Sequence, residues 1–206
     1  MLQPDHSPAA DRNKQAILDV LLQVLPYPGT RGNALEIASG TGQHVAWFAA
    51  GLPGWTWQPS DAQADGFKSI NAWVLQQAVG NVRAPVLLDV MAASWLPTDN
   101  LFDLIYCANM LHIAPWATCA ALMRGSAQHL VPGGQLITYG PYLEDAIPTS
   151  PGNLAFDQSL RERNPAWGIR RREDVEAQAA KAGLKLRARH AMPANNLLLV
   201  WAQALT

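Results

Sequence analysis

Residues 34–44 read Ala-Leu-Glu-Ile-Ala-Ser-Gly-Thr-Gly-Gln-His, and this stretch decides the fold. Ala34 to Ala38 is a short, mostly apolar run, and Gly40 and Gly42 follow it as a tight turn. From Val45 to Leu52 apolar residues recur at helical spacing. A strand, a glycine turn and a helix in this order are typical of open α/β sheets, which bind ligands at the carboxyl ends of their strands.

The same alternation of strands and helices continues to residue 139. Elements of this length imply right-handed crossovers and a parallel sheet with helices on both faces. A helix precedes the first strand from Ser7-Pro8 to Leu25, and Pro26 and Pro28 should end it. Beyond the residue 34–52 unit, we predict strands at Thr56–Pro59, Val86–Leu88, Leu101–Ala108 and Gln135–Tyr139, and helices at Phe67–Val79 and Ala117–Leu130.

The last third of the chain departs from this rhythm. Ile147–Asn153 is rich in Pro, Ser, Gly and Thr and predicts a loop, followed by a short helix, so residues 143–170 resemble an inserted lid. A helix at Glu173–Ala182 and strands at Leu184–Ala191 and Leu197–Ala204 follow, and the short link between these strands allows only an antiparallel hairpin. We predict one domain over residues 1–206: a seven-stranded, mostly parallel α/β sheet.

Composition excludes several classes of protein. Of 206 residues 15% are charged, against about 25% in average domains, so the chain should form a compact globule. Fifteen basic and sixteen acidic residues give a net charge of -1, which disfavours nucleic acid as a partner. The apolar runs are shorter than the roughly 20 residues that span a bilayer, so no membrane association is expected. Cys107 and Cys119 are too few for a zinc site; we expect reduced thiols in a cytoplasmic protein, and no metal.

Acidic residues that follow the next two strands indicate a nucleoside ligand. Asp61 stands nineteen positions after Gly42 (61 − 42), where a carboxylate can accept hydrogen bonds from both ribose hydroxyls. Asp89 ends the third strand and suits the adenine amino group. A dinucleotide needs a small residue where Val45 stands, which disfavours NAD. S-adenosylmethionine (SAM) has no phosphate to hold and fits the looser turn.

These motifs resemble those of class I SAM-dependent methyltransferases, together with Phe102–Ile105 and Leu130–Gly134, although Ala38 stands where that class usually has its first glycine. More narrowly, the chain resembles the uncharacterised family that includes methyltransferase-like protein 26, also described as domain of unknown function 938. The matching strings are Ser7–Lys14, Glu36–His44, Gln58–Asp61, Tyr139–Tyr142, Asn153–Gly168 and Met192–Asn196. The resemblance implies a Rossmann-like fold and SAM as the cofactor, with no settled substrate.

Candidate cofactor residues lie at the glycine turn, at the acidic strand ends and after the fourth strand. We expect SAM to contact Glu36, Ala38, Gly40, Thr41, Gly42, His44, Asp61, Asp89 and Asn109. The alternative for Glu36 is a structural strand-end carboxylate, and Asp61 and Asp89 are alternatively helix N-caps.

Candidate catalytic and substrate residues lie after the fourth and fifth strands, in the inserted segment and in the first helix. His112 has the right chemistry for a general base, since an imidazole pKa near 6.5 suits proton removal from a hydroxyl, but it can equally be structural. Met110 and Leu111 replace the prolines of the base- and amide-methylating signature. Further catalytic candidates are Tyr139, Tyr142 and Arg161; the substrate candidates are Asn13, Lys14, Asp157, Arg161, Asn164 and Trp167.

The inserted segment has its own alternatives. Asp157 and Arg161 are four apart and share a helix face, so they are placed to cover an acceptor; otherwise the segment is a surface excursion and Trp167 fills the core. Arg170-Arg171-Arg172 is predicted to be a solvated approach to a helix, and the alternative is that it recruits an anionic substrate.

The function we expect is SAM-dependent, in-line methyl transfer to a small molecule. A SAM-binding or interaction module without catalysis remains an alternative, because fold does not fix function. An NAD-dependent oxidoreductase is a weaker one. The oligomeric state is left open.

Overall fold

The computed structural model describes residues 3–25 and 30–203. Pro26 and Pro28, predicted to end the first helix, lie outside these residues. In chain order the elements are α1 (Pro8–Val24), β1 (Gly32–Ile37), α2 (Gln43–Gly51), β2 (Trp55–Asp61), η1 (Ala64–Gly66), α3 (Phe67–Gln76), β3 (Val86–Leu87), β4 (Phe102–Ala108), α4 (Ala117–His129), β5 (Leu130–Leu143), α5 (Pro151–Arg163), β6 (Arg170–Arg171), α6 (Arg172–Lys181), β7 (Leu184–Met192), η2 (Pro193–Asn195) and β8 (Asn196–Gln203).

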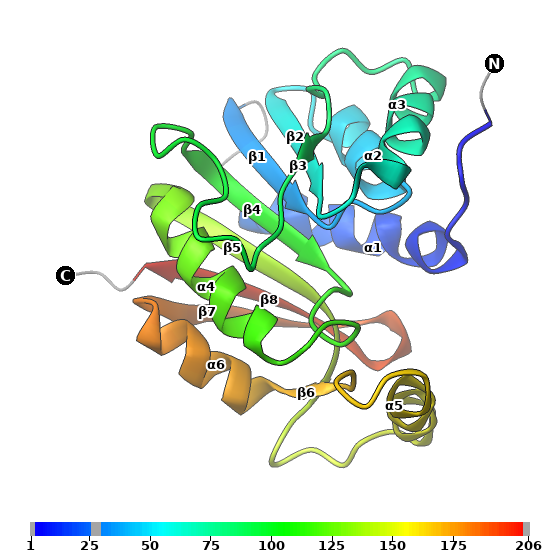
Figure 1. The fold of residues 1–206 in the computed structure, drawn as a ribbon, viewed down its shortest axis with the longest axis vertical. Coiled ribbons are helices and arrows are strands. Elements are labelled where there is room, and N and C mark those ends of the chain that lie inside the picture. Colours follow the sequence, from blue (N-terminus) through cyan, green and yellow to red (C-terminus); the bar gives the residue numbers. More distant parts are fainter. Residues whose placement is uncertain (1–2, 26–29, 204–206) are drawn as a thin grey trace.

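One twisted sheet organises the molecule (Figure 1), with the strand order β3-β2-β1-β4-β5-β8-β7. Strands β1 to β5 are parallel, and β8 runs antiparallel to both β5 and β7. The mostly parallel seven-stranded sheet with its terminal hairpin is therefore confirmed. The short β6 pairs with the end of β5 beside this path and was not predicted, because two residues carry no periodic pattern.

Helices cover both faces of the sheet, as predicted. The core between the sheet and α1 to α3 holds Ile17, Phe48 and Ile70, and the core beneath α4 and α6 holds Leu122 and Val175. Helix α1 begins where Ser7 caps it: the Ser7 hydroxyl accepts a hydrogen bond from the Ala10 N–H at 3.3 Å, and Pro8 occupies the first turn. In Figure 1 these layers are the blue-to-cyan helices and the green and orange helices.

Several predicted boundaries are wrong: α3 ends at Gln76 rather than Val79, β5 extends to Leu143 rather than Tyr139, and two segments that contain helix or strand breakers were assigned wrongly. Ser150 caps α5 and Pro151 starts it, so residues 151–153 are helical rather than loop. Strand β5 already begins at Leu130, so Pro132-Gly133-Gly134 lies inside the strand instead of separating it from α4. Both sequences contain breakers that here take permitted places, proline in a first helical turn and Gly133 with φ +83°.

Helix α5 lies outside the two helical layers, past the strand ends (Figure 1). The parallel strands bring Glu36 of β1 into register with Tyr106 of β4, and Ala108 of β4 with Tyr139 of β5. Glu36 and Tyr106 therefore project from the same face of the sheet, near its carboxyl edge. Within residues 3–25 and 30–203, no helix is long and apolar enough to cross a membrane.

Candidate functional site

The glycine turn between β1 and α2 is shaped by three residues with positive φ: Ala38 (+56°), Gly40 (+53°) and Gly42 (+87°). A side chain at Gly42 would put its Cβ 2.5 Å from the Ile70 Cα, so this glycine lets α3 pack against the turn. The space over Gly40 is open to 4 Å. Ala38 adopts a left-handed conformation that glycine reaches without strain, which explains the glycine typical of this position.

Glu36 is buried just before this turn. Its side chain is 2% exposed, and Oε2 has no hydrogen-bond partner among the described residues. Burial raises the pKa of Glu36 to about 8; a hydrogen bond from Ser39 opposes this, and the negative charge of Asp61 adds to it. Such a carboxyl group is set to take a ligand that donates hydrogen bonds.

Gln43, the first residue of α2, was not predicted as a site residue. It is 3% exposed, and its Oε1 accepts hydrogen bonds from the Ser7 N–H and from the Thr41 hydroxyl, the latter at 3.2 Å. Its Nε2 is buried without a partner in the described chain. No side chain caps the α2 N-terminus, since Gly42 holds the cap position. The glycine turn thus has an unsatisfied carboxyl group at one end and an unsatisfied amide donor at the other.

Asp61 and Asp89, the acidic residues at the ends of two strands, each accept a hydrogen bond from a backbone N–H in a turn. Asp61 Oδ2 accepts the Gly40 N–H at 3.0 Å, which links the end of β2 to the glycine turn. Asp89 follows β3, is exposed, and accepts the Met91 N–H at 2.8 Å. Both carboxylates therefore shape the local turns, and neither caps an α-helix.

His44, Asn13 and Tyr139 meet in one buried polar cluster against β4. His44 Nε2 lies 2.6 Å from Asn13 Oδ1, and its Nδ1 lies 3.5 Å from the Tyr106 hydroxyl. Burial raises the pKa of the Tyr139 hydroxyl, and the nearby side chains of Asn13 and Asn196 oppose this rise. Burial and then Lys14 lower the pKa of His44 to about 4, so its ring is uncharged near neutral pH. Tyr106 and Asn196 were not predicted as site residues. Tyr106 lies within an ordinary apolar strand pattern, and its pairing with Glu36 is visible only in the sheet register.

Lys14 is not part of this cluster. It pairs with Asp11 at 2.5 Å and lies 4.6 Å from the centre of the Trp47 ring. Tyr142 points elsewhere as well, because its hydroxyl donates to Thr138 Oγ1 at 2.9 Å inside the core, and burial raises its pKa. The structure therefore does not bring Lys14, a substrate candidate, or Tyr142, a catalytic candidate, into the polar cluster around His44.

His112 and Asn109 occupy the loop after β4. The Asn109 N–H donates to the Tyr139 carbonyl at 2.8 Å, and Asn109 has φ +60°. His112 is 5% exposed; a Cβ on Gly140 would come within 3.2 Å of its ring, and the Phe156 ring of α5 meets it edge-on with centroids 5.7 Å apart. Burial, and then the charges of Arg170 and Arg163, lower the pKa of His112 to about 4. A base with this pKa holds a proton weakly.

The inserted segment places its candidates in structural contacts. Asp157 accepts hydrogen bonds from Arg161 Nε at 2.8 Å and from the Ile169 N–H at 2.6 Å, and the predicted sharing of a helix face is confirmed. Asn164 Oδ1 accepts the Ala166 N–H at 2.9 Å. Trp167 is half-buried beneath Arg163, 5.7 Å from the guanidinium carbon, so it does not fill the core.

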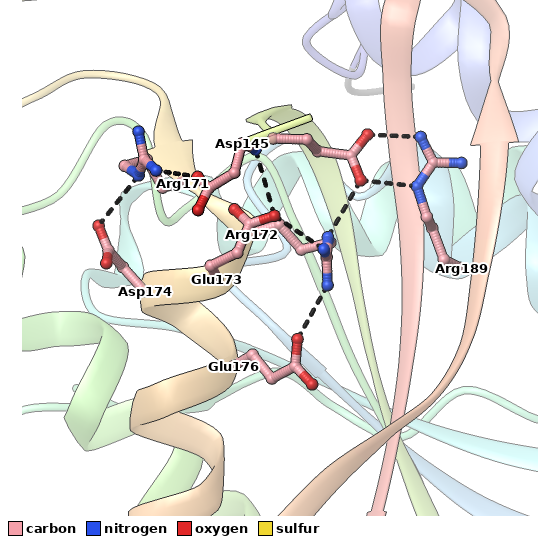
Figure 2. Close-up of polar contacts among 8 residues, drawn as sticks. Asp145, Arg171, Arg172, Glu173, Asp174, Glu176 and Arg189 are labelled. Carbon is pink, nitrogen blue, oxygen red and sulfur yellow. Dashed lines mark hydrogen bonds and ion pairs between the residues drawn. The ribbon is translucent and has the colours of Figure 1, made fainter. Parts of the chain in front are cut away.

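The prediction of a solvated arginine run holds for Arg171, which is exposed, and is wrong for Arg170 and Arg172, which are partly buried. Arg170 donates to the carbonyls of Leu111, Ala114 and Ala166 and so fixes the loop that carries His112. Figure 2 shows the other two arginines in an ion-pair network. Arg171 pairs with Asp145, and Arg172 pairs with Glu144, Glu173 and Glu176. The acidic partners are up to 28 residues away in sequence, so a local charge count does not show them.

Residues 4–203 match the model of the family described as "Protein of unknown function (DUF938)". The chain belongs to the DUF938 family. Within the part of this DUF938 protein that is described, no three His, Cys, Asp or Glu side chains are grouped to hold a metal ion.

Several solved structures of methyltransferases have a fold similar to that of this chain. An O-methyltransferase family protein from Burkholderia thailandensis is 17% identical, with TM-score 0.79, covering 95% of this chain and 57% of that one. An O-methyltransferase family 2 protein from Planctomyces limnophilus, in complex with apigenin, is 18% identical, with TM-score 0.80 and coverage of 95% and 60%. A methyltransferase of calicheamicin biosynthesis in its SAH-bound form is 15% identical, with TM-score 0.75 and coverage of 95% and 55%. The DUF938 chain thus spans less than two thirds of each of these proteins.

The DUF938 site therefore has two parts with different chemistry. At the glycine turn, buried donors and acceptors lack partners. Beyond it, uncharged imidazole, amide and phenol groups from α1, α2, β4 and β5 lie together, with His44 in contact with both Asn13 and Tyr106. Such groups suit the orientation of a ligand by hydrogen bonds.

Proposed function

We propose that this DUF938 protein binds S-adenosylmethionine and methylates a small-molecule acceptor. The observation that carries the proposal is the pair of buried, unsatisfied groups, Glu36 Oε2 and Gln43 Nε2. Leaving such groups without partners costs about 1–3 kcal/mol each, so a ligand that satisfies both is favoured. The amino-acid end of SAM offers an ammonium group to Glu36 and a carboxylate to Gln43 and the α2 N-terminus.

The remaining contacts of the cofactor follow from the strand ends. Asp61 would accept hydrogen bonds from the ribose hydroxyls, Asp89 would take the adenine amino group, and the open face of Gly40 allows close approach. Val45 is fully buried where a dinucleotide needs a small residue, which supports SAM over NAD. When bound, SAM supplies an electrophilic methyl group.

The acceptor would lie against the cluster of Asn13, His44 and Tyr139 and beside His112. Because both imidazoles are uncharged at neutral pH, these residues would orient the acceptor by hydrogen bonds, and His112 would accept its proton only transiently. We extend the proposal to one domain over residues 1–206 with segment 143–170 as a cover, a cytoplasmic location, no nucleic-acid partner, and a relation to methyltransferase-like protein 26.

Calorimetry with SAM, S-adenosylhomocysteine (SAH) and NAD tests the cofactor. We expect the first two to bind and NAD not to. Gln43→Glu keeps the oxygen that accepts from Ser7 but places a negative charge near the SAM carboxylate, so binding should weaken at least about tenfold, the effect of 1.4 kcal/mol. Gln15→Glu, on the exposed side of α1, is the matched control and should bind normally.

Tight NAD binding, or equal SAM affinity in both glutamate variants, would contradict the assignment. Catalysis is tested separately, by incubating the protein and SAM with pooled cell metabolites and measuring SAH. Binding without any SAH formation would favour the non-catalytic module instead.

A further inference from the structure

A cavity of about 190 Å³ lies between three segments that are distant in sequence: the end of β5 with the following loop, the start of α5, and the turn between β7 and β8. Specific contacts hold these segments together. Asn153 Nδ2 of α5 donates to the Asn195 carbonyl at 3.1 Å, and Arg189 of β7 pairs with Glu144 just after β5. The cavity is therefore surrounded by segments that are bonded to one another in the folded chain.

The wall of the cavity combines apolar and neutral polar groups. Ile147, Met192 and Leu197 supply apolar surface. The polar share comes from two hydroxyl residues and three amide residues: Thr149, Ser150, Asn153, Asn195 and Asn196. Hydroxyl and amide groups both donate and accept hydrogen bonds, so this wall can donate hydrogen bonds to an uncharged polar molecule or accept them from it.

The charges that line the cavity are already paired. Arg189 donates to both oxygens of Glu144, at 2.8 and 2.5 Å, and Arg172 adds a third hydrogen bond to Glu144 at 3.0 Å. Figure 2 shows Arg189 in this fork-like contact. A carboxylate or ammonium group that entered would lose its hydration and find no free counterion in the described lining, which is costly.

The cavity is connected to the proposed site. Asn196 lines it and pairs with Pro141 of β5, two residues from Tyr139. The side chains of Asn196 and Asn13 both lie near enough to the Tyr139 hydroxyl to oppose the rise of its pKa by burial. Tyr142, which also lines the cavity, is three residues from Tyr139 along β5 and therefore points to the opposite face of the sheet. A small molecule held in the cavity would therefore approach the Asn13–Tyr139 pair past Asn196.

We propose that this cavity binds the methyl acceptor and selects an uncharged polar molecule, such as an amide or alcohol, over a carboxylate or an amine. That the ligand is the methyl acceptor rests on the proposed function, whereas the preference of the cavity for uncharged ligands does not.

Benzamide, benzoate and benzylamine form a probe set of similar shape with neutral, negative and positive polar ends. Each is titrated to about 50 mM into ¹⁵N-labelled protein, with and without SAH, because ligands of this size bind weakly. We expect benzamide to shift the amide signals of Asn153, Asn195 and Asn196, with a dissociation constant at least tenfold below those of benzoate and benzylamine. Shifts by a charged probe at equal or lower concentration, or no shift at these residues with any probe, would overturn the proposal.

A blocking variant localises the effect without disturbing the ion pair. Ala191 lines the cavity and is exposed, so Ala191→Leu should remove benzamide binding while Arg189 and Glu144 stay paired. Ala155→Leu is the control, because Ala155 lies on the exposed side of α5 and outside the cavity lining. Undiminished benzamide binding by Ala191→Leu would refute the location. Failure of SAH to bind in calorimetry would instead refute the proposed function and leave the cavity result standing.

Discussion

Replacing Glu36 by glutamine should stabilise the ligand-free protein and weaken its binding of SAH. The pKa of Glu36 rises from 4.5 to about 8 on folding, chiefly through burial. Between these two pH values the folded state holds a proton that the unfolded state has lost, so stability falls as pH rises through this window. Glutamine has nearly the same shape and does not titrate.

The size of the effect follows from the shift. About 3.5 pK units at 1.36 kcal/mol each set an upper limit of roughly 5 kcal/mol, reached above pH 8. Between pH 5 and pH 7.5 the unfolding free energy of the glutamine variant should gain about 3 kcal/mol over that of the wild type. Water entry and relaxation around the ionised group would reduce this value.

Urea unfolding at pH 5, 6, 7 and 7.5 measures the difference between variant and wild type, in which titration of all other groups largely cancels. Asp99→Asn, which removes one exposed carboxylate, is the control, and its difference should stay flat. A difference for Glu36→Gln that is also constant from pH 5 to 7.5 would refute the account of a buried, unsatisfied carboxyl group. In calorimetry, SAH binding by the wild type should release a proton near pH 7, because the ammonium group favours ionised Glu36, and the variant should lose this release.

Three further substitutions test other contacts. Asp61→Asn keeps an oxygen for the Gly40 N–H but removes the charge, so SAH affinity in calorimetry should fall by about 1.5–3 kcal/mol; an unchanged affinity would exclude Asp61 from the ribose site. Glu144→Gln should lower the urea unfolding free energy by about 1–3 kcal/mol at pH 7. Hydrogen bonds from Arg189 lower the pKa of Glu144, so this contribution is present above pH 4.5 and fades as acid protonates the wild type; a gap that persists at low pH would contradict it. Arg170→Lys retains the charge but cannot replace three hydrogen bonds to carbonyls, so limited proteolysis should cut residues 109–116 faster, and equal cleavage rates would argue against this role.

The residues proposed to hold the cofactor could be grouped from the sequence because they are contiguous or follow strand ends. Glu36 and the glycine turn lie within nine residues, and parallel strands bring Asp61 to the same edge of the sheet. The order of strands could be predicted as well, since the alternation of strands and helices permits few topologies. Gln43 lies within residues 34–44, but the sequence alone does not show that its amide nitrogen is buried without a partner.

Asn13, His44, His112 and Tyr139 could be predicted as candidate site residues, but the cavity lined by Glu144 and Arg189 could not, because its contacts depend on tertiary packing. Arg170, Arg172 and Arg189 look alike in sequence, yet the first binds backbone carbonyls and the other two share the carboxylate of Glu144. Which partner an arginine takes depends on how the segment after β5 returns across the strand ends, and that path is set by tertiary packing. Residues 144–153 thus form one wall of the cavity, and the β7–β8 turn, which follows some forty residues later, forms the other. The selectivity of the cavity should therefore change with substitutions in either wall, and Ala191→Leu addresses the one that lies outside the inserted segment.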